Sequence, residues 1–341
     1  MSRIAILGAG AWGTALAINL AGRRDHSGGL SHEMTLWTRS PSVAERMLRA
    51  HENVSYLPGF TLPRELAITS DLVRAVQEAE IVVGVVPSEH VRATYEQCAP
   101  WLHPGQLVVS ATKGIEDQTL LRMSEVIRET LAVQSLKLPV GVLSGPSFAQ
   151  EVAAGSPTAL TIAFAEIAPA IRVQREFGGD TLRLYTNEDI VGVELGGALK
   201  NVIAIAAGVV AGLGLGHNAA AALITRGIAE ITRLAVACGG RRETLAGLSG
   251  IGDLVLTCTG SLSRNRLVGL ELGKGRSLDE ILAGLGGKVA EGVRTTYAAL
   301  ALAQTHGVEM PIAAQMGAIL AGTQSPPEAI RELMARPGRD E

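Results

Sequence analysis

The stretch RIAILGAGAWGTALAINLA, residues 3–21, decides the fold of the first half of the chain. Residues 3–7 predict a strand, the loop GAGAWG follows at residues 8–13, and TALAINLA predicts a helix. A lone Gly-x-Gly-x-x-Gly is a weak signal, but this context is typical of dinucleotide-binding folds, in which the pyrophosphate lies at the helix N-terminus. The alternative is a tight turn without a ligand. The first interpretation predicts that four loop residues contact a dinucleotide: Gly8, Gly10, Ala11 and Gly13.

Trp12 and Arg39 are the side chains that we expect beside this dinucleotide. Trp12 either packs over the cofactor or fills the gap between the loop and a neighbouring strand. The second predicted strand ends in LWTRS, and Arg39 stands where NAD enzymes usually carry an acidic residue for the ribose 2′-hydroxyl. Because a guanidinium there favours a 2′-phosphate, we expect NADPH to be preferred, with NADH as a second coenzyme. The alternative is an exposed structural arginine.

The chain changes character near residue 187. Before that point, amphipathic stretches alternate with β-branched runs: IAIL, MTLW, LAIT, EIVVGVV, QLVVSAT, VGVLSG, ALTIAF and LRLYT. This rhythm predicts a Rossmann-like, doubly wound α/β domain with a mostly parallel sheet over residues 1–187. Only RRDHSGGLSHE, residues 23–33, has the composition of a long solvated loop. Segments of helical length follow over residues 188–341 and predict an all-α domain, with Asn187 as the N-cap of its first helix.

Composition excludes several classes of protein. With 341 residues, 47% apolar and 18% charged, the chain is long and apolar enough for two well-buried domains. A net charge of −3 and 3% aromatic residues argue against a nucleic-acid partner. Three dispersed cysteines without a ligand cluster indicate neither disulfides nor a metal site, and they fit the reducing cytoplasm. The apolar run at the N-terminus is too short for the apolar region of a secretory signal, so we expect no export. The apolar run at residues 202–216 is shorter than the roughly 18 residues of a membrane-spanning helix.

Polar groups follow three further predicted strands, where the carboxyl edge of a doubly wound sheet holds its ligand. Pro87 in VVPSEH is expected beside the nicotinamide ribose, and Lys113 in SATKG follows the next strand. Lys113 is either a site residue or a solvated loop residue. LSGPSFAQE, residues 143–151, has a Gly-Pro-Ser turn that presents backbone N–H groups and a hydroxyl to an anion.

The helical half carries a lysine in an apolar environment. In GGALKNVIAIAAG, residues 196–208, only Lys200 and Asn201 have polar side chains, and a lysine is rarely buried without a partner. Burial lowers the pKa of a lysine and a carboxylate such as Asp253 keeps it charged, so Lys200 suits a general acid for ketone reduction in an apolar cleft. The alternative is a lysine whose stem reaches the surface.

A phosphate site is predicted at SRNR, residues 263–266. Arg264 offers its guanidinium fork and Asn265 its amide to phosphate oxygens. The alternative is that SRNR is a solvated helix start and that Asp253 is a helix cap.

The chain resembles the glycerol-3-phosphate dehydrogenase family, of the bacterial NAD(P)-dependent type, over essentially its whole length. The motifs occur in family order: GAGAWG, LWTR, VPS, SATKG, GPSFAQE, ELGGALKNVIAIAAG, GLSGIGDLVLTCTG, SRNR and VAEG. The resemblance implies reduction of dihydroxyacetone phosphate to sn-glycerol 3-phosphate, the backbone of membrane phospholipids. It also implies that Lys200 is the proton donor and acceptor and that Lys113 contacts both substrate and cofactor.

The resemblance implies two sets of ligand-binding residues. Those for NADPH are Trp12, Arg39, Lys113, Ala149, Arg264, Val289 and Glu291. Those for the phosphorylated triose are Lys113, Gly145, Ser147, Lys200, Asp253, Thr257, Ser263, Arg264 and Asn265. Asn201, beside Lys200, is also expected at the triose. Two other functions stay open at this point: a related reductase of 2-keto or 3-hydroxy acids, and an NADPH sensor without chemistry. The apolar, glycine-rich helical half also offers a face for a homodimer.

Overall fold

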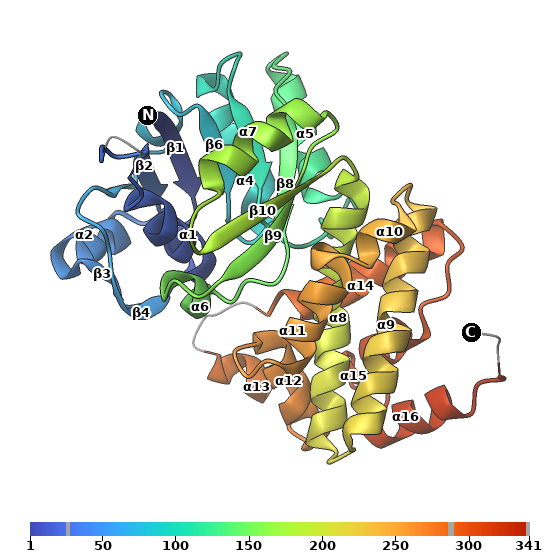
Figure 1. The fold of residues 1–341 in the computed structure, drawn as a ribbon. Coiled ribbons are helices and arrows are strands. Elements are labelled where there is room, and N and C mark those ends of the chain that lie inside the picture. Colours follow the sequence, from blue (N-terminus) through green and yellow to red (C-terminus); the bar gives the residue numbers. More distant parts are fainter. Residues whose placement is uncertain (25–27, 286–289, 339–341) are drawn as a thin grey trace. The chain divides into compact units, whose positions relative to one another are not determined.

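The structure, a computed structural model, describes residues 1–24, 28–285 and 290–338 and divides into two compact units (Figure 1). The first combines Met1–Lys113 with Leu121–Ile190, and the second combines Gly114–Leu120 with Val191–Glu341. The division thus falls after Ile190 rather than after residue 187. The sequence did not predict that the short segment after Lys113 belongs to the second unit. It joins the second unit because Ile115, 3% exposed, belongs to the helical core.

An eight-stranded sheet forms the centre of the first unit, in the order β10-β9-β8-β7-β6-β1-β2-β5 (Figure 1). All neighbouring strands are parallel except β8 and β9, which run antiparallel. The mostly parallel sheet predicted from the sequence is therefore confirmed. Its strands are β1 (Ser2–Leu7), β2 (His32–Trp37), β5 (Ala67–Thr69), β6 (Ile81–Gly84), β7 (Leu107–Ser110), β8 (Val140–Ser144), β9 (Thr158–Ala163) and β10 (Leu182–Asn187).

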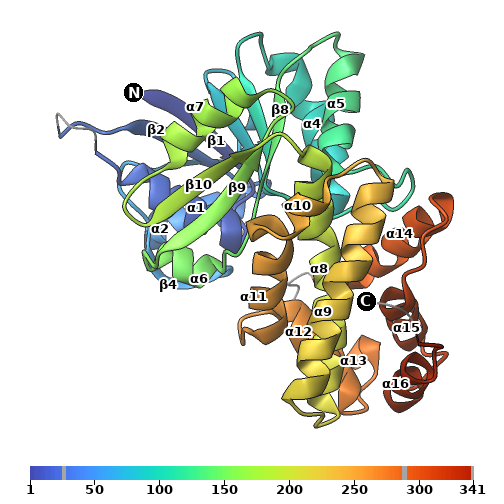
Figure 2. The same ribbon diagram turned by 45° about the vertical axis from the view of Figure 1, so that its right-hand side comes forward.

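Helices cover both faces of this sheet because its central strands are apolar on both sides (Figure 2). In β1, Ile4 and Ile6 pack into one core, whereas Ala5 and Leu7 pack into the core on the opposite face. The first core includes residues of α1 (Ala11–Ala21), α2 (Pro41–Ala50) and α7 (Ile167–Phe177). The second includes residues of α3 (Leu72–Val76), α4 (Val91–Cys98) and α5 (Met123–Val133).

Smaller elements complete the first unit. The sequence did not predict the antiparallel pair β3 (Glu52–Asn53) and β4 (Leu57–Thr61). Short turns of 3-10 helix, η1 (Ser88–His90) and η2 (Ala99–Trp101), flank α4. The short helix α6 (Ala149–Ala153) packs against α1.

The described part of the second unit is helical, as predicted (Figure 2). Helices α8 and α9 lie side by side in both views and are joined by a short glycine-rich turn. The helices are α8 (Ile190–Gly212), α9 (His217–Ala237), α10 (Arg242–Leu245), a π-helical turn η3 (Leu248–Gly252), α11 (Asp253–Thr259), α12 (Arg264–Gly273), α13 (Leu278–Gly284), α14 (Glu291–Thr305), α15 (Pro311–Leu320) and α16 (Pro326–Met334).

Helix α8 is the central element of this unit. It is long and apolar enough to cross a membrane, with a mean hydropathy of 1.6, yet 89% of its most apolar window is buried inside the protein. Ile203 and Ile205, at 0% exposure, lie in the helical core. A helix that is apolar on all sides is expected at the centre of such a core.

Glycines let α8 and α12 approach closely. A Cβ on Gly269 of α12 would lie 1.8 Å from the Ile205 carbonyl oxygen, and one on Gly208 of α8 would lie 2.1 Å from the Arg266 carbonyl oxygen. Larger residues at either position would push the helices apart. This contact brings the SRNR segment, at the start of α12, beside the middle of α8.

Two local predictions were wrong. Asn187 is the last residue of β10 and not the N-cap of α8, which begins at Ile190; its Oδ1 accepts a hydrogen bond from the Asp189 N–H. The prediction of a solvated loop over residues 23–33 was wrong at the two ends of that segment. Residues 25–27 lie outside the described part of the chain. Arg23 donates to the carbonyls of Phe177 and Gly178 where α7 ends, and His32 begins β2 at 4% exposure. These carbonyls need a donor because no further helical turn follows.

Candidate active site

The glycine loop between β1 and α1 has the backbone geometry of a cradle. Gly8 has φ of 123°, and a Cβ there would lie 2.9 Å from the Val85 carbonyl carbon. A Cβ on Gly13 would lie 2.0 Å from the Gly8 carbonyl oxygen. Around Gly10, by contrast, no described atom lies within 4 Å of a Cβ position. Two glycines therefore let the loop close on itself, and the third leaves space beside the start of α1 that fits a pyrophosphate.

The remaining residues predicted for the cofactor lie near this loop or at neighbouring strand ends. Ala11 is the first residue of α1, and Trp12 packs against apolar core residues, as in the gap-filling interpretation. Arg39 is exposed and follows the end of β2, beside the start of α2. Pro87 directly precedes η1 after β6, and Ala149 begins α6. Val289 lies outside the described residues.

Lys113, Gly145 and Ser147 come together at the carboxyl ends of β7 and β8. Nζ of Lys113 donates to the Gly145 carbonyl over 3.2 Å, and Oγ of Ser147 donates to the same oxygen over 3.0 Å. Gly145 has φ of 138°, and a Cβ there would lie 3.2 Å from Cα of Leu160, which makes the position a glycine site. The first unit thus places an ammonium and a hydroxyl together at the sheet edge where ligands of doubly wound folds bind.

In the second unit, Lys200 is buried in α8 with two partners. Its Nζ lies 2.5 Å from Oδ1 of Asp253 and 2.6 Å from Oγ1 of Thr257. Lys200 is 7% exposed and Asp253 is 0% exposed. The Thr257 hydroxyl also lies 2.6 Å from the Asp253 carbonyl oxygen, to which it donates, so its lone pairs face the ammonium. The surface-reaching alternative for Lys200 is excluded by this burial.

The π-helical turn η3 places Asp253 as the first residue of α11, where its carboxylate faces Lys200 rather than capping the helix. Glycines permit this turn, since a Cβ on Gly250 would lie 2.0 Å from the Leu245 carbonyl oxygen. π-turns of this kind occur frequently at functional sites.

Asn201, Asn265 and Gly292 form a chain of hydrogen bonds next to Lys200. The Gly292 N–H donates to Oδ1 of Asn265, and Nδ2 of Asn265 donates to Oδ1 of Asn201, both over 2.9 Å. Because a backbone N–H can only donate, it fixes the orientation of both amides. The Nδ2 group of Asn201 is then the end that remains to donate.

In the SRNR segment, Ser263 caps a helix and Arg264 is accessible to solvent. Ser263 is the N-cap of α12, and its Oγ accepts the Arg266 N–H over 3.2 Å, so this hydroxyl has a structural task. Arg264 is accessible to solvent, while desolvation by the surrounding protein lowers the pKa of its guanidinium and the charge of Glu291 raises it. Glu291, at the start of α14, is therefore close to Arg264.

Asn53 is a candidate that the sequence reasoning missed. It is 1% exposed, and its Nδ2 donates to the Ala9 carbonyl inside the glycine loop over 2.9 Å. No element predicted from the sequence pointed to Asn53, and its partner lies 44 positions earlier in the chain.

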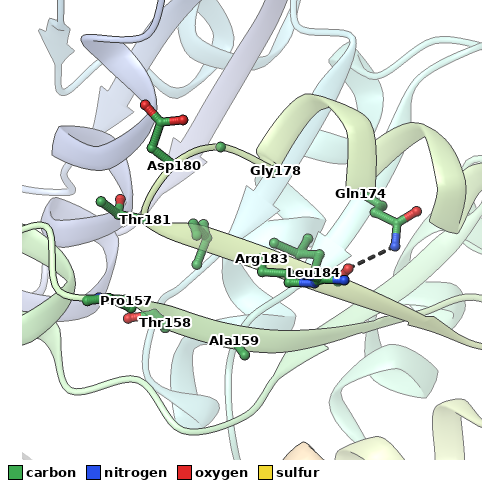
Figure 3. A pocket seen from close by; sticks show the side chains of 11 residues that line it. Pro157, Thr158, Ala159, Gln174, Gly178, Asp180, Thr181, Arg183 and Leu184 are labelled. Atoms are coloured by element: carbon green, nitrogen blue, oxygen red, sulfur yellow. Dashed lines mark hydrogen bonds between the residues drawn. The ribbon is translucent and has the colours of Figure 1, made fainter.

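A cavity of about 590 Å³ lies in the first unit away from all predicted site residues (Figure 3). It follows β10 and the turn before it, where Nε2 of Gln174 donates to the Leu184 carbonyl over 2.8 Å. Asp180 and Arg183 are its charged lining residues. It shares no residue with the glycine loop or with the Lys200 cluster, so the candidate active site is defined by the polar clusters and not by this cavity.

Comparison with known proteins gives a consistent result along the whole chain. Residues 3–170 match the family described as NAD-dependent glycerol-3-phosphate dehydrogenase N-terminus, and residues 189–331 match the corresponding C-terminus. Proteins named glycerol-3-phosphate dehydrogenase [NAD(P)+] from Acidobacterium capsulatum and Koribacter versatilis are 63% and 58% identical to this chain. Both alignments cover 100% of this chain, and 100% and 99% of the two relatives.

Solved structures agree with these matches. A crystal structure of glycerol-3-phosphate dehydrogenase from Coxiella burnetii is 39% identical with a TM-score of 0.91, covering 98% of this chain and 99% of that one. The glycerol-3-phosphate dehydrogenase structure from Saccharomyces cerevisiae is 26% identical with a TM-score of 0.83, covering 98% and 99%.

Proposed function

The chain belongs to the NAD-dependent glycerol-3-phosphate dehydrogenase family, and we propose that Lys200 is the acid with which it reduces dihydroxyacetone phosphate to sn-glycerol 3-phosphate. The cofactor is NAD(P)H, which when bound supplies the hydride that the ketone carbon accepts. The carbonyl oxygen then needs a proton. The observation that carries the proposal is the buried contact of 2.5 Å between Nζ of Lys200 and Oδ1 of Asp253.

The surroundings of Lys200 suit proton donation. The bonds to Asp253 and Thr257 hold the ammonium nitrogen in place. In the proposed reaction, this ammonium transfers a proton to the ketone oxygen as the alkoxide develops. The Asp253 carboxylate stabilises the charged lysine before the transfer. In the reverse direction, neutral Lys200 takes the proton from the hydroxyl of glycerol 3-phosphate.

Binding of the phosphate is assigned to donors of the helical unit beside Lys200. Arg264 offers a guanidinium, and the Asn265 chain orients Asn201 so that its Nδ2 donates. In the first unit, Lys113 stays a proposed substrate residue at the carboxyl edge of the sheet. Anchoring the phosphate positions the C2 carbonyl for the reaction, which lowers the entropic part of the barrier.

Arg39 is proposed to favour NADPH over NADH. It is exposed after β2 and offers a guanidinium where a 2′-phosphate would lie. The residues present fit the dinucleotide because space is kept around Gly10 at the start of α1.

Two alternative functions are disfavoured. Relatives that are 49–63% identical to almost the full chain are named glycerol-3-phosphate dehydrogenase, which supports a phosphorylated ketone over a keto acid. The intact set of Lys113, Lys200 and Asp253 argues against a sensor without chemistry. The activity places the protein in glycerophospholipid synthesis, for which we propose the cytoplasm.

The test of this function is an assay of NADPH and NADH oxidation with three substrates. Dihydroxyacetone phosphate should be reduced, whereas dihydroxyacetone and a phosphate-free 2-keto acid should be poor substrates because they lack the anchoring anion. Turnover of the keto acid instead of the phosphate would overturn the assignment.

We also propose that the protein is a homodimer formed through its helical unit. The apolar, glycine-rich composition of this unit supports the proposal, because it can supply a face for a second copy. Light scattering should give twice the mass of the chain, and a monomer at micromolar concentration would refute the proposal.

A further inference from the structure

The side-chain amide of Asn53 forms hydrogen bonds through both its nitrogen and its oxygen, and one of these bonds reaches the glycine loop. Its Nδ2 donates to the Ala9 carbonyl over 2.9 Å and to Oγ1 of Thr14 over 2.8 Å. Its Oδ1 accepts the Tyr56 N–H over 3.3 Å. Asn53 is 1% exposed and Thr14 is 0% exposed, so these bonds form away from water. Since a carbonyl only accepts and an N–H only donates, Ala9 and Tyr56 determine which end of the amide carries the nitrogen.

The bond to Ala9 sets the direction of the next N–H in the loop. In a trans peptide, the carbonyl and the following N–H point in opposite directions, and the Ala9–Gly10 peptide is trans. The Ala9 carbonyl points at Asn53, so the Gly10 N–H points away from it. No described residue accepts a hydrogen bond from this N–H, and around Gly10 the space for a Cβ is empty.

We propose that Asn53 is a positioning residue for the dinucleotide, which turns the Gly10 N–H toward the pyrophosphate. The inference rests on the proposed function in that the glycine loop is taken as the cofactor site. Asn53 does not contact the ligand itself. It fixes one peptide plane before binding, so the N–H is oriented in advance and less entropy is lost when the anion arrives.

The β3–β4 hairpin gains a role from this assignment. Asn53 is the last residue of β3, and Leu57 of β4 is 1% exposed and packs with Ala15 of α1 and Val152 of α6. The hairpin is therefore anchored against the helix that follows the glycine loop. The hairpin thus supplies the side chain that bonds to the Ala9 carbonyl.

Gln106 offers a matched control in the same unit. It is 0% exposed, its Nε2 donates to the carbonyls of Val76 and Ala79, and its Oε1 accepts the His103 N–H. It is thus a buried amide with two donated bonds and one accepted bond, like Asn53. It fixes the turn between α3 and β6 and touches no residue of the glycine loop. Loss of Gln106 should cost stability alone.

The experiment compares Asn53→Ala, Asn53→Asp and Gln106→Ala in the full-length protein. The measured quantities are the Kd of NADPH and of NADH, the KM for dihydroxyacetone phosphate, kcat at saturating NADPH, and Tm. Both Asn53 variants should raise the Kd of both coenzymes about tenfold or more, equally for NADPH and NADH, because the pyrophosphate is common to them. The KM for the ketone and kcat should change less than about twofold, since uniform binding is what is removed.

Gln106→Ala should lower Tm about as much as Asn53→Ala does. Its Kd for NADPH should stay within about twofold of the wild-type value. Asn53→Asp keeps the size of the side chain and its bond to the Tyr56 N–H, so it serves if Asn53→Ala fails to fold. Thr14→Val adds a third arm, because it removes one acceptor of Nδ2 but leaves the bond to Ala9; its Kd for NADPH should stay within about twofold.

Two results would overturn the inference: an unchanged Kd for NADPH in folded Asn53 variants, or an equal increase of Kd in Gln106→Ala. Failure of the proposed function is a separate outcome, because the wild-type protein would then bind NADPH without reducing dihydroxyacetone phosphate, and the Kd comparison of the variants would still be valid.

Discussion

The ammonium nitrogen of Lys200 lies 2.5 Å from Oδ1 of Asp253, and both side chains are buried in the helical unit. The two residues are 53 positions apart in the chain, on α8 and at the start of α11. A lysine in such surroundings loses its hydration, and the Asp253 carboxylate and the Thr257 hydroxyl compensate for that loss. The pair therefore keeps a charged donor in place before substrate binds.

Replacing Asp253 by Asn should lower kcat about 100-fold, because Lys200 would lose both its counter-charge and its fixed position. The affinity for NADPH should change little, as the glycine loop belongs to the other unit. Steady-state kinetics and an NADPH titration measure both. A variant that lost only NADPH binding would contradict the positioning role of Asp253.

The Asn265 chain predicts an effect on substrate binding. In Asn265→Ala the Gly292 N–H loses its acceptor and Asn201 is no longer oriented. The KM for dihydroxyacetone phosphate should rise about 10- to 100-fold, as expected for loss of hydrogen bonds to a charged group. The KM for dihydroxyacetone should not change, which makes the phosphate-free ketone the internal control. Equal effects on both ketones would show that Asn265 acts on folding rather than on the phosphate.

Arg39 predicts a change in coenzyme preference. Arg39→Ala should raise the KM for NADPH about 10- to 100-fold through loss of a charge-assisted bond to the 2′-phosphate, and should leave the KM for NADH unchanged. The two coenzymes are compared in the same assay. This pattern also separates Arg39 from Asn53, whose variants should weaken both coenzymes equally. An NADH effect as large as the NADPH effect would contradict contact with the 2′-phosphate.

Titration of Glu230 should make the free energy of unfolding depend on pH, independently of catalysis. It is 2% exposed, and its carboxylate accepts the N–H groups of Ile312 and Ala313 at the start of α15. Burial raises its pKa to about 7, against the opposing effects of these N–H groups and of Arg233 and Arg336. The folded protein thus binds a proton that the unfolded chain has released, so this stability is present below about pH 4.5 and lost as the pH rises through about 7.

The expected loss is about 3 kcal/mol, from the pKa difference of the folded and unfolded states. Urea unfolding at about pH 5 and pH 8 should show this decline in the wild-type protein and a much smaller one in Glu230→Gln, whose side chain does not titrate. Parallel pH dependence in the two proteins would show that Glu230 does not titrate in this range.

Much of the fold was predictable because it depends on local patterns. The eight apolar runs of the first half all became strands of one sheet, and the glycine loop lies between β1 and α1 as expected. The antiparallel direction of β9 was not predictable, since alternation of apolar runs does not encode strand direction. The same holds for residues 114–120, whose side chains pack on a helical core that is distant in sequence.

The pair of Lys200 and Asp253 could be predicted because a buried charge requires a partner of opposite charge. A lysine in an apolar helix needs a carboxylate, and Asp253 was the charged residue of a similarly apolar segment. Asn53 was not predictable because its partners are a backbone carbonyl and a hydroxyl, which leave no charge pattern in the sequence. The helix-cap role of Ser263 was one of the two interpretations of SRNR, and its hydroxyl accepts the Arg266 N–H; its place at the substrate stays a prediction, since the O–H can still donate.

The measurement that tests the central claim most directly is kcat of Lys200→Ala at saturating NADPH and dihydroxyacetone phosphate. The account predicts a fall of about 100- to 10,000-fold, the contribution of a positioned general acid, with the Kd of NADPH changed less than about twofold. Near-normal turnover in the folded variant would contradict the claim that Lys200 delivers the proton.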